Sequence, residues 1–170
     1  LTVHEGDEVI VQVTKPPRGN KGAKVTTHLS FVGKRLIFLP DSDFLGISRK
    51  ITDPAVREEL LAEAEKMRKR GEGFVVRTQA PFASKKALKA EAEYLKGLYR
   101  VMLDHAKTAK VGDLLYSDDD LPVRAMRDSM GEDATTMFVG ERELYNRLVA
   151  LAKLRGDLPV KKIVRYDGER

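Results

Sequence analysis

The stretch from Ser84 to Ala106 constrains the fold more than any other part of the sequence. Apolar residues recur there every three or four positions, which places them along one side of a helix. Ser84 is a favourable N-cap residue for this helix. A helix of this length with one apolar side has to pack against another layer. The stripe consists of Leu88, Ala92, Leu95, Tyr99, Met102 and Ala106.

Composition agrees with a folded, soluble chain. Of 170 residues, 42% are hydrophobic and 34% are charged, and no segment approaches the roughly 18 uninterrupted apolar residues of a membrane span. Cysteine is absent, which excludes disulfides, thiolate zinc sites and a cysteine nucleophile, and favours a cytoplasmic location. The chain begins without Met and without a secretion signal, so we expect an unexported fragment of a longer protein.

The first half has a pattern of strands followed by helices. Alternating or short apolar runs at residues 8–13, 25–31 and 36–39 predict three strands joined by short basic turns, typical of an antiparallel, barrel-like sheet and not of a βαβ unit. Asp53 and Pro54 predict the start of a helix that continues to the glycines at 71 and 73. A further strand is predicted over residues 73–78.

The second half has a different pattern, in which predicted strands and helices alternate as in an α/β layer. The predicted strands cover residues 114–116, 136–139 and 162–165, and the predicted helices cover residues 121–130 and 141–154.

Several polar clusters have an ordinary structural interpretation beside a chemical one. Asp118–Asp120 offers hard oxygen ligands for Mg²⁺, but consecutive acids more often cap a helix. Asp41 and Asp43 resemble an acid/base pair, yet their surroundings are typical of a turn. The basic residues at 66–70 complement the dipole at a helix end. Metal or catalytic spacing is lacking around His4, His28 and His105.

Three other segments are suited to anions. The net charge is +5 with a pI near 9.4, and the basic excess is concentrated between residues 15 and 50. Residues 18–22 place two cations on a glycine-rich loop, which suits a phosphate but also a plain hairpin turn. Residues 46–50 suit an anion or a simple surface. Arg77 and Thr78, at a strand end, match a terminal phosphate, or else Arg77 is a salt-bridge partner.

Taken in order, longer segments carry a resemblance to a known family: Glu8–Val13, Arg18–Ala23, Thr26–Thr27, Gly46–Ile51, Val75–Thr78 and Val123–Asp128. Their sequence and spacing resemble the motifs of the ribonuclease E/G family over nearly the whole chain.

The resemblance implies an α+β fold with three parts. Residues 1–27 would be the end of an antiparallel OB-type (S1-like) barrel, residues 28–122 an α+β 5′-sensor subdomain, and residues 123–170 a partial α/β RNase H-like layer. Enzymes of this family are Mg²⁺-dependent endoribonucleases that cut single-stranded, AU-rich RNA and prefer a 5′ monophosphate. The full-length enzyme is expected to be a homo-oligomer, a dimer or tetramer.

The same resemblance assigns site residues position by position. Arg77 and Thr78 match the pair that contacts the 5′ phosphate, and Gly33 and Ile37 match positions that supply backbone or base contacts. RNA-contacting or basic family positions are matched by Lys21, Arg18, Arg49 and Lys50. No catalytic or metal-binding residue is expected in this chain, because the aspartates that hold the metal follow beyond Arg170. The 170-residue chain alone is therefore predicted not to hydrolyse RNA.

Some positions depart from the family pattern. Residues 79–84 lack glycines common in relatives, and Leu45-Gly46 stands where Gly-Gly is frequent. The zinc-link cysteines are absent. A non-catalytic RNA-binding or scaffold protein, or a structural fragment with a silent site, therefore stays as an alternative.

Overall fold

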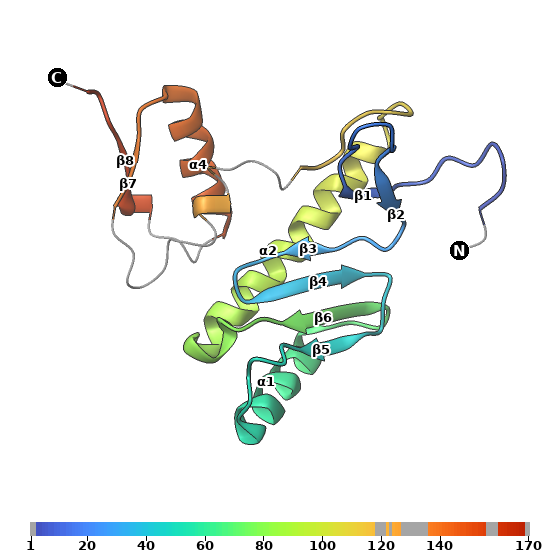
Figure 1. Ribbon diagram of the computed structural model, residues 1–170. Coiled ribbons are helices and arrows are strands. Elements are labelled where there is room, and N and C mark those ends of the chain that lie inside the picture. Colours follow the sequence, from blue (N-terminus) through green and yellow to red (C-terminus); the bar gives the residue numbers. More distant parts are fainter. Residues whose placement is uncertain (1–2, 118–121, 123, 127–135, 156–159, 169–170) are drawn as a thin grey trace.

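The computed structural model describes residues 3–117, 122, 124–126, 136–155 and 160–168. Within this part the chain is mixed α+β, as the sequence predicts, with its strands in three small sheets (Figure 1). The predicted acidic cluster at 118–120 and most of the predicted helix at 121–130 lie outside the described residues.

The largest sheet has four strands in the order β3-β4-β6-β5. β3 (Phe31–Val32) and β6 (Glu72–Val76) each pair antiparallel with β4 (Leu36–Pro40), whereas β5 (Leu45–Ile47) lies parallel to β6. Neighbouring parallel strands need a crossover connection. The helix α1 (Pro54–Met67) provides it between β5 and β6.

This βαβ unit corrects the expectation of a purely antiparallel front. The sequence predicts no strand over residues 45–47, because three residues around a central glycine carry little strand preference. The segment becomes a strand through pairing with a distant partner: Gly46 lies opposite Val75, and Ile47 opposite Val76. The strands predicted near 36–39 and 73–78 are confirmed with small shifts of their ends.

One face of the four-stranded sheet holds the main core. Side chains alternate along β4, so that Leu36 and Phe38 are buried while Ile37 and Leu39 are half-buried on the opposite face. The helix α2 (Lys85–Ala106) packs against β3 and β4, and α1 packs against β5 and β6. The predicted stripe of α2 supplies much of this core. The core residues of the two helices are Leu60, Ala64, Leu88, Ala92, Leu95 and Met102.

Both predicted helix starts are confirmed by their caps. The Asp53 carboxylate accepts hydrogen bonds from the backbone N of Ala55 at 2.9 Å and of Val56 at 3.3 Å, and Pro54 follows in the first turn. The Ser84 hydroxyl accepts from the backbone N of Ala87 at 3.2 Å. These local contacts satisfy amides that have no partner within the helix.

A separate two-stranded antiparallel sheet precedes this unit. It consists of β1 (Gln12–Lys15) and β2 (Lys24–Thr26). The strand predicted over 8–13 therefore begins later, and the run at 25–31 is divided between two sheets. The Gln12 side chain holds the chain near this division. Its Oε1 accepts from the backbone N of Ser30 at 2.9 Å, and its Nε2 donates to the carbonyl O of Ser30 at 3.1 Å.

The C-terminal part has its own small core. β7 (Met137–Val139) and β8 (Ile163–Arg165) run parallel and are joined through α4 (Arg142–Arg155) and the short helix η2 (Val160–Lys162). The alternation of strand and helix predicted here is confirmed over these elements. A second buried cluster lies between them, formed by Met126, Val139, Leu148, Ala152 and Ile163.

Residues 114–116 are not the predicted strand. They are irregular, with Leu114 exposed and Leu115 and Tyr116 packed against the main core. Two adjacent apolar residues in so short a segment contact the core without forming a strand. Among the described residues, no helix has the length and apolarity needed to cross a bilayer.

Candidate nucleic-acid interface

Three segments meet at one edge of the four-stranded sheet. Because β5 and β6 are parallel, their last residues lie at the same edge, and Ser48 N donates to the carbonyl O of Val76 at 2.8 Å. Because β4 is antiparallel to β6, its first residue Leu36 lies opposite Val76. The end of β6, the end of β5 and the turn between β3 and β4 therefore converge.

Arg77 lies at the centre of this edge. Its backbone N donates to the carbonyl O of Arg35 at 2.8 Å, and its Nη1 donates to the carbonyl O of Gly33. It forms no ion pair with any of the described residues. A guanidinium has five N–H donors, so its charge and further donors remain for an anion.

Gly33 and Ile37 contribute to this edge in different ways. Gly33 is buried, and its N donates to the carbonyl O of Leu36 at 2.8 Å, so that both of its backbone polar groups are used within the protein. Ile37 is half-buried and pairs with Val32 on one side and Val75 on the other. It therefore belongs to an apolar strip on the sheet face opposite the helices.

Thr78 follows directly in a tight turn and is half-buried. The turn is closed by the backbone N of Ala80, which donates to the carbonyl O of Arg77 at 3.0 Å. We call Gly33, Ile37, Arg77 and Thr78 the Arg77 site. Beyond it, a short 3-10 helix, η1 (Ala80–Phe82), ends on Phe82, whose side chain is 81% exposed.

Arg49 and Lys50 follow β5 and extend the positive charge of this edge. Both are exposed and neither forms an ion pair with a described residue. Their turn is held from within, because Arg57 Nη1 donates to the carbonyl oxygens of Ser48 at 3.0 Å and Ile51 at 2.8 Å. The structure thus brings these two cations to the same sheet edge as Arg77.

Arg18 and Lys21 lie elsewhere, in the turn between β1 and β2, which form a sheet separate from the one that ends at Arg77. Each donates its backbone N to the other's carbonyl O, at 3.0 and 3.1 Å, and Gly19 takes a φ of 57° in the turn between them. The hairpin-turn interpretation is therefore correct for the backbone.

The side chains of this hairpin nevertheless concentrate positive charge, because cationic residues lie opposite each other on its two strands. Arg18 lies opposite Lys21, and Lys15 lies opposite Lys24. All of these side chains are exposed, and none has an ion pair with a described residue. Directly opposed cations repel each other, and an anion bound across them would relieve that repulsion. We call Lys15, Arg18, Lys21 and Lys24 the cationic hairpin.

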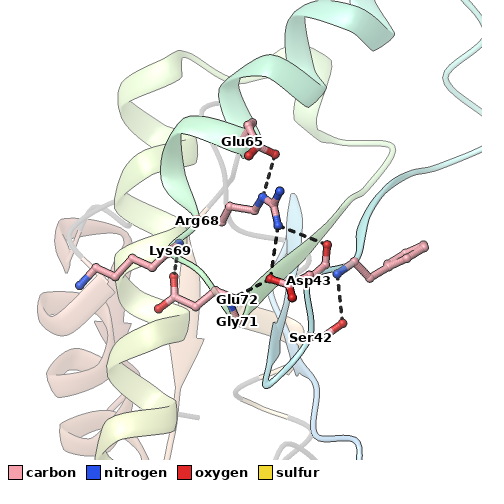
Figure 2. A network of polar contacts seen from close by, with 8 residues as sticks. Ser42, Asp43, Glu65, Arg68, Lys69, Gly71 and Glu72 are labelled. Atoms are coloured by element: carbon pink, nitrogen blue, oxygen red, sulfur yellow. Dashed lines mark hydrogen bonds and ion pairs between the residues drawn. The ribbon is translucent and has the colours of Figure 1, made fainter.

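The basic end of α1 has a structural role instead (Figure 2). Arg68 Nε donates to Glu65 Oε2 at 2.7 Å, and its Nη1 donates to the carbonyl O of Asp43 at 3.2 Å. The hydrogen bond to Glu65 raises the pKa of Arg68. Asp43 Oδ1 also accepts from Gly71 N at 2.9 Å, and Asp41 Oδ2 accepts from the Tyr99 hydroxyl at 3.1 Å, so both acids fix the segment between β4 and β5 to its neighbours, in agreement with the turn interpretation.

The described residues contain no group of three or more His, Cys, Asp or Glu that could hold a metal ion.

Comparison with known proteins decides the family. The ribonuclease E/G family model matches residues 30–170. The chain belongs to the ribonuclease E/G family. It is 35% identical over 168 residues to ribonuclease G of Haemophilus influenzae and 27% identical over 168 residues to ribonuclease G of Escherichia coli. It is also 30% identical over 132 residues to ribonuclease E of a Nostoc species.

These matches cover most of this chain but a minor part of each relative. The two ribonuclease G alignments span 99% of this chain and 34% of the relative, and the Nostoc alignment spans 78% and 19%. This ribonuclease E/G family chain therefore corresponds to about a third of the length of its ribonuclease G relatives.

Two residues that support the Arg77 site of this ribonuclease E/G family member are not predicted from the sequence. Arg35 supplies a carbonyl to Arg77, and Glu91 contacts Arg35 from α2. Glu91 lies three residues after Leu88, inside the apolar stripe of α2. An acidic residue on the apolar side of a helix is the one sequence signal here, because a buried carboxylate needs hydrogen-bond donors from elsewhere in the fold.

Proposed function

We propose that this chain is the RNA-binding, 5′-monophosphate-sensing portion of a ribonuclease E/G-type endoribonuclease. In this proposal the full enzyme cleaves single-stranded, AU-rich RNA with Mg²⁺ during RNA processing and decay, and the metal-binding subdomain lies outside these 170 residues. The observation that carries the proposal is the sheet edge at which Arg77, Thr78, Arg49 and Lys50 are brought together from separate segments.

The chemistry of a 5′ monophosphate suits this edge. It carries a charge of about −1.5 to −2 at pH 7 and three acceptor oxygens, whereas a 5′ hydroxyl carries neither. The Arg77 guanidinium, held by Gly33 but without a carboxylate among the described residues, supplies charge-assisted donors. The adjacent Thr78 hydroxyl supplies a further donor, and the exposed Arg49 and Lys50 raise the local positive potential.

The cationic hairpin supports a second contact with the same RNA. Its exposed cations suit the phosphate backbone further along the strand, where binding is independent of the chemistry at the 5′ end. By the family resemblance, residues 1–27 then belong to an S1-type domain, residues 28–122 to a 5′ sensor and residues 123–170 to an RNase H-like part. We expect the full-length enzyme to be a cytoplasmic homo-oligomer.

Fluorescence anisotropy tests the proposal. A short single-stranded RNA labelled at its 3′ end is titrated with the chain, once with a 5′ monophosphate and once with a 5′ hydroxyl, at one fixed salt concentration. We expect tighter binding of the monophosphate RNA. Arg77→Gln should remove that difference, a loss of about 1.5–3 kcal/mol, as for a hydrogen bond to a charged group.

Arg100→Gln is the matched control. Arg100 is an exposed arginine on α2, and among the described residues its one ion pair is a long contact of 3.9 Å with Glu93. Its replacement removes the same charge and should keep the preference for the monophosphate. Equal binding of the two RNAs by the unmodified chain would refute 5′ sensing by these residues.

A further inference from the structure

Glu91 is an acidic side chain buried within the main core. Its exposed fraction is 1%, although it lies in an α2 stripe otherwise lined by apolar residues. Its Oε1 accepts from the backbone N of Arg35 at 2.7 Å and of Leu36 at 3.0 Å, and its Oε2 accepts from Arg35 Nη1 at 3.1 Å. A buried carboxylate is tolerated only with such partners, so the contacts are integral to this region.

These contacts fix the turn between β3 and β4. Two successive backbone amides point at a single oxygen of Glu91, which determines the path of residues 33–36. Gly33 passes so close that a Cβ built there would lie 2.2 Å from Glu91 Oε1. The carboxylate therefore occupies the space that a larger residue at position 33 would need.

The same turn holds Arg77 from two directions. The carbonyl O of Arg35 accepts from the backbone N of Arg77, and the carbonyl O of Gly33 accepts from its guanidinium. A continuous chain of hydrogen bonds thus runs from Glu91 through the turn to the guanidinium of Arg77.

We propose that Glu91 is a positioning residue: by fixing the β3–β4 turn it aims the Arg77 guanidinium, and so determines how well the site distinguishes a 5′ monophosphate from a 5′ hydroxyl. The inference rests on the proposed function of the Arg77 site. It adds a residue that contacts no RNA and acts only through the β3–β4 turn.

The chemistry of the partners explains why a carboxylate is needed. Each of the three groups around Glu91 is a donor, so both carboxylate oxygens accept. A glutamine can keep one oxygen toward the backbone amides, but its NH₂ group then faces Arg35 Nη1, donor against donor. An aspartate keeps the charge and both acceptors but is shorter by one methylene.

The test compares Glu91→Gln, Glu91→Asp and Leu60→Ala in the anisotropy assay with the two RNAs, together with urea unfolding of each variant. Leu60 is a core residue of α1 outside the hydrogen-bonded chain, so Leu60→Ala lowers stability without altering the turn. We expect Glu91→Gln to reduce the ratio of monophosphate to hydroxyl affinity roughly tenfold, the size of one charge-assisted hydrogen bond.

Leu60→Ala should keep that ratio despite its lower unfolding midpoint, and Glu91→Asp should restore part of it. If the glutamine variant fails to fold, the aspartate variant carries the test, with a smaller but measurable reduction expected. An unchanged ratio in a folded Glu91 variant, beside a clear preference in the unmodified chain, would overturn the inference and leave the proposed function standing. No preference in the unmodified chain would instead remove the proposed function, and this inference with it.

Discussion

Lys96 extends from the middle of α2 to the last residue of α1, where its Nζ donates to the carbonyl O of Met67 at 2.6 Å. The same Nζ lies 2.7 Å from Glu72 Oε2, at the start of β6, and 5.7 Å from the centroid of the Phe74 ring. The side chain is only 8% exposed. One buried cation therefore ties both helices to the sheet and satisfies a helix-end carbonyl.

Replacing this cation should destabilise the chain strongly. We expect Lys96→Met to lower the free energy of unfolding by about 2–4 kcal/mol, because it removes the cation beside Glu72 and the donor to the Met67 carbonyl. Urea denaturation measures the decrease. Lys107→Met removes the exposed pair with Asp104 and should cost much less, because water screens a pair at the surface. Equal decreases in the two variants would contradict the role assigned to Lys96.

Stability should also fall in acid through Glu72. Burial alone raises the pKa of this carboxyl, but the hydrogen bonds from Lys96 and from the backbone of Lys69 outweigh it, so that the pKa lies below its ordinary value of 4.5. A carboxyl with a lowered folded pKa contributes stability above its unfolded pKa and loses it as the pH falls through the folded value.

We therefore expect the free energy of unfolding to decrease as the pH is lowered below about 4.5, with a shallower decrease in Glu72→Gln. Some acid dependence should remain in that variant, because the pKa of Asp104 is also lowered, by its hydrogen bond with Lys107. Urea titrations at a series of pH values between neutral and acid check the difference. Identical profiles for the two proteins would show that Glu72 is not the group responsible.

Gly33→Ala should impair the Arg77 site without touching Arg77. The new Cβ would meet Glu91 Oε1 at 2.2 Å and the carbonyl O of Leu36 at 3.0 Å, so the turn or the carboxylate must move. We expect a decrease of about 1–3 kcal/mol in stability and a weaker preference for the 5′-monophosphate RNA.

Gly97→Ala is the control for this substitution. Gly97 lies within α2 with no atom near the position of a Cβ. Its replacement should raise stability by about 0.5–1 kcal/mol and leave RNA discrimination unchanged. Unchanged discrimination in Gly33→Ala as well would mean that the turn does not position Arg77.

The cationic hairpin should contribute affinity without contributing 5′ selectivity. Arg18→Gln and Lys21→Gln are expected to weaken the binding of the monophosphate and hydroxyl RNAs by the same factor. The slope of log affinity against log salt concentration should become less negative by about 0.7 for each phosphate of the single strand that the variant no longer neutralises. Anisotropy at several salt concentrations measures both quantities. A change confined to one of the two RNAs would place these cations at the 5′ end instead.

Local chemistry explains which parts of this fold can be predicted from the sequence. The helix starts at Asp53 and Ser84 depend on contacts with amides two or three residues away, and the stripe of α2 depends on spacing within one helix. The strand at residues 45–47 depends instead on β6, more than twenty residues later, and nothing within the segment itself indicates a strand. The parallel pairing that places Arg49 and Lys50 beside Arg77 cannot be predicted for the same reason.

The residues of the candidate site also differ in whether they can be predicted from the sequence. Arg77 and Thr78 are found as a pair at a strand end, because their chemistry is apparent within two residues. Glu91 and Arg35 are separated by 56 positions and have no meaning for the site until the chain is folded. A buried polar contact of this kind depends on how the chain folds. The sequence shows only that an acidic residue lies among the apolar residues of a helix.

The two separate hydrophobic clusters should unfold locally at different rates. Each encloses its own set of backbone hydrogen bonds, one around β4, β6 and α2, the other around β7, α4 and β8. Deuterium uptake should therefore proceed in two classes, with the amides of the smaller C-terminal cluster exchanging first and those of the central strands last. The strands that carry the Arg77 site would then keep their protons while the C-terminal cluster opens and closes.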